Sequence, residues 1–147
     1  MMTDHLRITA LDHVGINVSD LDGAMSWYQE AFGFEEVRPF SIDELGMRGS
    51  FLVAPGGVGL ELIERTGASG AGELADNPPD LALRLGLGHL CFRVDDVDAW
   101  HARLLELGAI DRFSPRDSPE PGVRMGWVAD PYGNFIELLD RSTDITG

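Results

Sequence analysis

The chain has 147 residues and a mass of 16.0 kDa, the size of one domain, and its 25 acidic residues against 11 basic ones give a formal net charge of −14. So acidic a chain is not expected to bind nucleic acid or an anionic membrane surface. All 11 basic residues are arginine, so no lysine is present to form a Schiff base, and the single Cys91 excludes an internal disulfide. The chain shows neither a long apolar run nor a signal peptide, which predicts a cytoplasmic protein.

The first half of the chain predicts one strand, one helix and three further strands. Residues 11–18 alternate between apolar and polar positions, as in a strand with one buried face. A helix follows, capped by Ser19 or Asp20 and ended by Gly33, with apolar residues at helical spacing. The three strands that complete this half are predicted at 34–40, 47–54 and 58–64.

The second half predicts the same order of elements. A strand at 88–94 and a helix near 96–107 precede strands near 109–113, 123–129 and 134–140. The predicted linker, about 66–84, is rich in glycine, alanine and serine and includes a short helical turn near 79–85. The ends of the chain, 1–7 and 142–147, are predicted to be loose tails.

The two halves are copies of one plan, because the sequence matches itself at an offset of 76 residues. Residues 11–24 match 87–100, and residues 46–65 match 122–141 with seven identities in 20 positions and no gap. We therefore predict an α+β fold of two tandem βαβββ modules, about 8–65 and 85–141. Each module is marginal for a core of its own, so we expect one domain over 1–147.

The repeat preserves four residues of the types that bind metals: His13 and Glu61 in the first half, His89 and Glu137 in the second. The spacing from histidine to glutamate is 48 in both halves. Each glutamate lies between apolar strand neighbours and so points away from the face that the helix covers. Two imidazoles and two carboxylates suit a six-coordinate first-row metal with two positions left open.

Three segments resemble the vicinal oxygen chelate superfamily, which includes glyoxalase I, methylmalonyl-CoA epimerase, extradiol dioxygenases and bleomycin-resistance proteins. They are LDHVGINVSDLDGAMSWYQEAFGF, GHLCFRVDDVDAWHARLLELGA and DPYGNFIELLDR. The resemblance implies a cupped, mostly antiparallel sheet with the helices on its outer face. It also implies that His13, Glu61, His89 and Glu137 are the metal ligands, in the pattern of bacterial lactoylglutathione lyases.

A metal at this site predicts proton-transfer chemistry in a glyoxalase-like isomerase, epimerase or lyase. The substrate would be a small molecule with adjacent oxygens, the metal one divalent ion (Ni, Zn, Co, Mn or Fe), and the bases Glu137 and Glu61. Asn17 and Arg93 share the inner face with the histidines, and Phe51 and Trp127 correspond across the repeat, so these four are candidates for substrate binding. The resemblance further implies a homodimer, with modules paired within a chain or swapped between chains.

Two alternatives remain open from the sequence. In an extradiol-type dioxygenase, His13, His89 and Glu137 would hold non-haem iron, and Glu61 would be a surplus ligand. A non-enzymatic antibiotic-binding protein of the bleomycin-resistance type could use the acidic surface to hold a cationic drug. Such proteins generally lack the metal-binding side chains, and this chain keeps all four of them.

Overall fold

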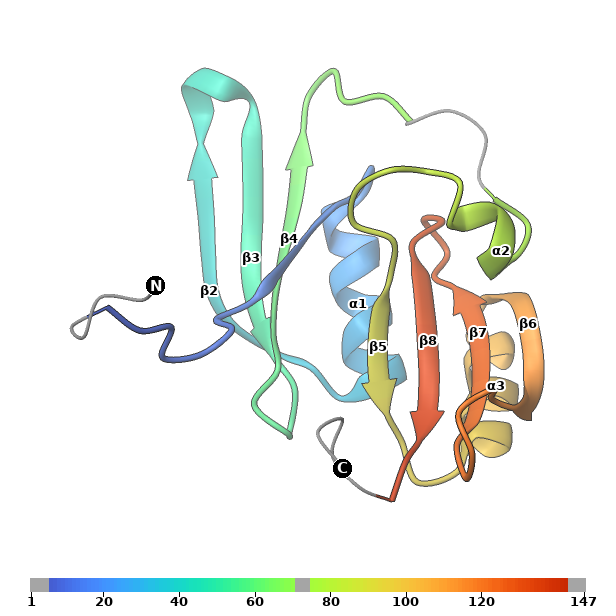
Figure 1. Cartoon of the computed structure of the whole chain (residues 1–147). Helices are drawn as coiled ribbons and strands as arrows, with labels where there is room; N and C mark the ends of the chain where they lie inside the picture. Colours follow the sequence, from blue (N-terminus) through green and yellow to red (C-terminus); the bar gives the residue numbers. More distant parts are fainter. Residues whose placement is uncertain (1–5, 71–74, 143–147) are drawn as a thin grey trace. The chain divides into compact units, whose positions relative to one another are not determined.

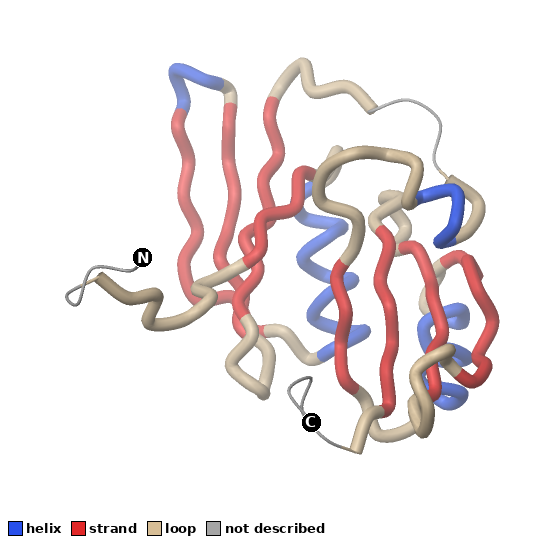
Figure 2. Tube along the Cα trace, in the orientation of Figure 1, coloured by secondary structure: helices blue, strands red, loops and turns tan. Residues whose placement is uncertain are grey.

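The computed structural model describes residues 6–70 and 75–142, which fall into two compact units, residues 1–68 and 69–147. Both units have the predicted βαβββ order, with the helices and strands shown in Figure 2. The boundary between the units lies inside the predicted linker. Among the described residues, no helix is long and apolar enough to cross a membrane.

Unit 1 is a four-stranded mixed sheet in the order β1-β4-β3-β2 (Figure 1). Strand β1 pairs in parallel with β4, and the other neighbours are antiparallel. Its elements are β1 (Val14–Asn17), α1 (Leu21–Phe32), β2 (Glu35–Ile42), the 3-10 turn η1 (Asp43–Leu45), β3 (Met47–Val53) and β4 (Gly59–Arg65).

Unit 2 repeats this topology in the order β5-β8-β7-β6, with β5 parallel to β8. Helix α3 packs against three of its four strands, β6, β7 and β8. The elements are α2 (Pro78–Leu81), β5 (Leu90–Arg93), α3 (Val97–Glu106), β6 (Ile110–Asp117), β7 (Arg124–Ala129) and β8 (Phe135–Asp140).

Both long helices begin at an aspartate whose side chain accepts a backbone N–H in the first turn. Asp20 accepts from Gly23 at 3.0 Å, and Asp96 accepts from Ala99 at 2.9 Å. These bonds satisfy donors that the helix itself leaves unpaired. Helix α1 ends as predicted at Gly33, which has φ of +72°, a conformation that favours glycine.

The core of each unit lies between its helix and one face of its sheet, and the repeat preserves it. Residues on the last strand of each unit, Leu60 and Leu62 in unit 1 and Ile136 and Leu138 in unit 2, are fully buried. Since successive strand residues point to opposite faces, Glu61 and Glu137 lie on the face that the helix does not cover.

Several predicted boundaries were wrong. The first strand begins at Val14 rather than residue 11, because β4, its partner, begins at Gly59 and the pairing stops there. Strand β6 extends to Asp117 beyond the predicted 113, because irregularities after Asp111 and Phe113 break its alternation. The short helix α2 covers only 78–81, and η1 was not predicted. Most of the predicted tails, residues 1–5 and 143–147, lie outside the described residues.

Candidate metal centre

In unit 1, the structure brings His13 and Glu61 together. Their Nε2 and Oε2 atoms lie 3.1 Å apart, with 32% and 19% of the two side chains exposed. Glu61 comes from the middle of β4, and His13 directly precedes β1. Gly15 is the register partner of Glu61 and leaves open space beside the pair, since no atom lies within 4 Å of where its Cβ would be. The pair is therefore held by the sheet and remains accessible.

Unit 2 builds the same pair from His89 and Glu137. Nε2 of His89 and Oε2 of Glu137 are also 3.1 Å apart, with 35% and 15% of the side chains exposed. The place of Gly15 is taken by Cys91, the register partner of Glu137. Burial and the neighbouring charge of Glu137 raise the pKa of the Cys91 thiol to about 12. At neutral pH this thiol is protonated, so it is not a thiolate nucleophile.

The two histidines differ in what their second ring nitrogen contacts. Nδ1 of His13 lies 2.7 Å from Oδ2 of Asp12. The hydrogen bond with Asp12 is the main reason that the pKa of His13 is raised, and the charge of Glu61 adds to it against the effect of burial. A carboxylate on one imidazole nitrogen orients the ring and leaves the other nitrogen for a metal. In unit 2 the corresponding position is Gly88, which has no side chain to offer.

Asp12 is the residue that the sequence reasoning missed. The only available signal was a carboxylate directly before a candidate ligand, and neighbouring strand residues normally point to opposite faces. The contact forms because Asp12 and His13 precede the first ladder pair of β1 and are not held in its alternation.

An aromatic ring contacts each histidine, at positions equivalent in the repeat. The rings of His13 and Phe51 are 5.1 Å apart and nearly perpendicular, and those of His89 and Trp127 are 4.3 Å apart. Phe51 is the register partner of Glu61, and Trp127 is that of Glu137. Each His–Glu pair therefore has an apolar wall on one side.

The other two predicted substrate-binding residues lie farther along the same strands. Asn17 and Arg93 are exposed at the ends of β1 and β5, on the same face as Gly15 and Cys91. Their register partners are Ile63 and Leu139.

The four proposed ligands suit a divalent first-row metal in their chemistry. In the structure, each unit brings two of these four side chains together. Each unit offers one imidazole nitrogen and one carboxylate oxygen, which are ligands that such metals accept. Within residues 6–70 and 75–142, no group of three or more histidine, cysteine, aspartate or glutamate side chains is arranged to hold a metal. Each pair alone is thus half of the predicted site.

Comparison with known proteins gives one family. The model of the Glyoxalase/Bleomycin resistance protein/Dioxygenase superfamily matches residues 10–138. A lactoylglutathione lyase from Schizosaccharomyces pombe is 28% identical over 95% of the chain, and the chain spans about half the length of that enzyme.

Two further relatives match the chain. An ethylmalonyl-CoA/methylmalonyl-CoA epimerase from Cereibacter sphaeroides is 34% identical over 69% of the chain and 73% of its own length. The crystal structure of a glyoxylase/bleomycin resistance protein/dioxygenase domain from Frankia sp. EAN1pec has a TM-score of 0.73 at 25% identity. It covers 94% of this chain and 96% of the Frankia chain.

Proposed function

The chain belongs to the Glyoxalase/Bleomycin resistance protein/Dioxygenase superfamily, and on that premise we propose that it is a metal-dependent isomerase, epimerase or lyase. Its substrate would be a small molecule with two adjacent oxygens. The observation that carries this proposal is the repeated His–Glu pair, with the same 3.1 Å separation in both units. The lyase and epimerase among the relatives support a reaction of this general class.

In this proposal His13, Glu61, His89 and Glu137 hold one divalent metal ion, as members of the superfamily typically do. The bound metal would act as a Lewis acid toward the two substrate oxygens. The proposal requires the two pairs to face each other, either within one chain or between the chains of a homodimer. Because two carboxylates balance a divalent charge, the loaded site would be formally neutral.

The two glutamates are the proposed bases. Each is only partly exposed, and each has one oxygen 3.1 Å from an imidazole Nε2, a spacing that suits two ligands of one metal ion. A carboxylate so placed can accept a proton from the carbon next to a carbonyl group and return it to a neighbouring atom. Such a transfer needs no change in oxidation state. Since the sequence contains no lysine, no amine side chain of that type competes with the carboxylates for the role of base.

The aromatic rings and the ends of β1 and β5 are the proposed contacts for the rest of the substrate. Phe51 and Trp127 would exclude water from one side of each pair. Asn17 could donate a hydrogen bond, and Arg93 could hold a carboxylate or phosphate group of the substrate.

The dioxygenase alternative is less well supported, because it leaves Glu61 without a role. The distance of Glu61 from its histidine equals that of Glu137 from its own.

The direct test is to measure metal binding by variants that each lack one of the proposed ligands. We expect the purified protein to contain one divalent metal per four-residue site, measured by elemental analysis. His13→Ala or His89→Ala should reduce its affinity strongly, and Glu106→Gln, an exposed change on α3, should not. Equal metal content in all these proteins would contradict the proposed site.

Activity is tested by exchange of substrate protons for deuterium. The metal-loaded protein should catalyse exchange at the carbon next to the carbonyl group in a panel of α-hydroxyketones, hemithioacetals and acyl thioesters, followed by NMR. The active compound class would identify the substrate chemistry. Glu137→Gln should retain metal and lose exchange, whereas oxygen consumption with a catechol would favour the dioxygenase.

A further inference from the structure

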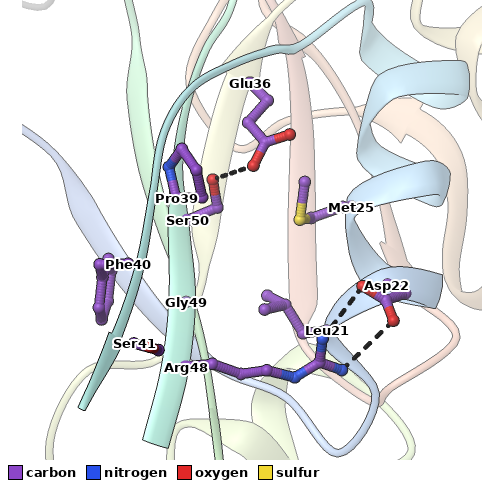
Figure 3. Close-up of a pocket in the computed structure, with 10 residues that line it drawn as sticks. All are labelled: Leu21, Asp22, Met25, Glu36, Pro39, Phe40, Ser41, Arg48, Gly49 and Ser50. Carbon is purple, nitrogen blue, oxygen red and sulfur yellow. Dashed lines mark hydrogen bonds and ion pairs between the residues drawn. The ribbon is translucent and has the colours of Figure 1, made fainter.

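Unit 1 contains a pocket on the helix side of its sheet, away from the His13–Glu61 pair. The pocket has a volume of about 560 Å³ and lies between α1 and the hairpin of β2 and β3 (Figure 3). Ser50 lines it and pairs with the buried Leu62, whereas Phe51, the next residue, pairs with Glu61 on the opposite face. The proposed metal ligands take no part in the lining.

The pocket has polar groups at two ends and apolar groups between them. At one end, Oε1 of Glu36 accepts a hydrogen bond of 2.8 Å from the Ser50 hydroxyl. At the other, Arg48 is held by Asp22 and Glu64, so its charge is already balanced. Figure 3 shows Leu21 and Met25 on the helix side between these ends. The Glu36 carboxylate retains lone pairs for a further donor.

Unit 2 has a direct side-chain contact at the corresponding positions. The helix position that matches Met25 at the repeat offset is His101, which is buried. The strand position that matches Glu36 is Asp111, since Glu36 pairs with Leu52 and Asp111 pairs with the equivalent Val128. Nε2 of His101 lies 3.0 Å from Oδ1 of Asp111. In unit 2 an imidazole ring therefore joins the helix to the strand carboxylate directly, whereas in unit 1 the equivalent residues, Met25 and Glu36, line the pocket.

One position on the helix-facing side of the third strand differs between the two units. Gly126 of β7 has no side chain, and a Cβ there would lie only 3.2 Å from a methyl group of Val97 in α3. In β3 this position is Ser50, whose hydroxyl bonds to Glu36 and lines the pocket. Helix α3 packs against β6, β7 and β8, whereas the main strand partner of α1 is β4.

We propose that this pocket binds a small molecule with a flat nitrogen heteroaromatic ring of the imidazole type, whose N–H donates to Glu36. The ring would lie against the Met25 thioether, a contact that aromatic rings favour. A carboxylate acceptor makes the hydrogen bond stronger than one between neutral groups. Because 560 Å³ exceeds the volume of one such ring, the ligand would carry a further substituent that extends along α1. This site does not depend on the proposed metal chemistry.

The test uses two probes of nearly the same shape. 4-Methylimidazole is the histidine side chain itself, and 4-methylthiazole lacks the N–H. We expect 4-methylimidazole to shift the amide NMR signals of Met25, Glu36 and Ser50 at millimolar concentration, and 4-methylthiazole to shift them much less. Any binding of the imidazole to a metal would affect signals near His13 and His89 instead, so the two events are distinguished by position.

Variants separate the pocket from unspecific binding. Glu36→Gln should weaken 4-methylimidazole binding about tenfold, because a neutral acceptor replaces a charged one. Glu35→Gln, the adjacent change on the exposed strand β2, should leave it unchanged. Met25→His should fill the pocket in the manner of His101 and prevent binding. Equal binding of the two probes, or binding that is unaffected by Glu36→Gln, would overturn the proposal, as would the absence of shifts at the pocket.

Discussion

Units 1 and 2 are nearly identical on one face of the sheet and differ on the other. On the open face, both have a His–Glu pair at 3.1 Å and an aromatic ring against the histidine. On the helix face, unit 2 has a partly buried His101–Asp111 bond, whereas the equivalent residues of unit 1, Met25 and Glu36, line a pocket. A duplicated fold can thus keep one face constant while the packing of the other diverges, which is expected if only the first face must act with its copy.

The largest effects should follow from removing a proposed base. Glu61→Gln and Glu137→Gln should each lower turnover at least about a hundredfold, since general-base catalysis contributes factors of that order. If the two units are equal in function as well as geometry, both single variants should lose turnover. The double variant should then lose little more turnover than either single variant. Steady-state kinetics on the substrate found by proton exchange measures this. Full activity in either variant would show that its unit supplies no base.

Equivalent core positions should have equivalent effects on stability. Leu62→Ala and Leu138→Ala each remove a fully buried side chain, and each should lower the free energy of unfolding by about 2–5 kcal/mol. Urea unfolding followed by fluorescence measures the change. One shared transition for both variants would mean that the units unfold together, whereas two separate transitions would mean that they are independent. Leu83→Ala, at an exposed position, is the control and should have little effect.

Asp12 provides a test of the difference between the histidines. Asp12→Asn should reduce metal affinity about tenfold, because the carboxylate that orients His13 is lost. It should also lower the pKa of His13 toward its ordinary value, since the hydrogen bond to Asp12 is the main cause of its increase. Calorimetry with the metal and NMR titration of the metal-free protein measure the two effects. An unchanged affinity would mean that Asp12 has no role in orienting the ring.

The smallest effect concerns acid stability in unit 2. Burial raises the pKa of Asp111, but the hydrogen bonds from Ser114 and His101 outweigh it and hold the pKa below its ordinary value. The ionised group therefore stabilises the fold above the unfolded pKa of about 4, and this contribution is lost as the pH falls through the lower, folded pKa.

The pH dependence of Asp111→Asn measures this contribution. Because Asp111 is partly exposed, the gain should be well under about 1 kcal/mol. The stability difference between the wild type and Asp111→Asn should grow from pH 3 to pH 5, and unfolding midpoints at each pH would show it. A difference that does not change with pH would contradict the assignment.

The sequence predicted the order of elements and the face of the sheet on which Glu61 and Glu137 lie, because these depend on periodicity and register. A period of two fixes that Glu61 and Glu137 point away from Leu60 and Ile136, whatever the details of packing. The aromatic contacts were within reach for the same reason, since Phe51 and Trp127 share a register with the glutamates.

The features that escaped prediction depend on local deviations or on distances between elements. The irregular pairing of β6 changes which side chains face the helix, and alternation alone does not locate it. The contact of Asp12 with His13 depends on where the β1 ladder stops. The pocket lies between α1 and the hairpin of β2 and β3, and the space between a helix and two strands has no signature in the hydrophobic pattern.

The parallel pairing of the first strand with the last has a consequence for the order of assembly. β1 and β4, or β5 and β8, are the sequence-distant ends of each unit, and the histidine and glutamate are 48 residues apart. Closing so long a loop is slow compared with forming a hairpin or a helix. Each pair therefore forms only when its whole unit has folded. A partly folded unit would lack its His–Glu pair, so any ligand that requires the pair would bind only to the folded unit.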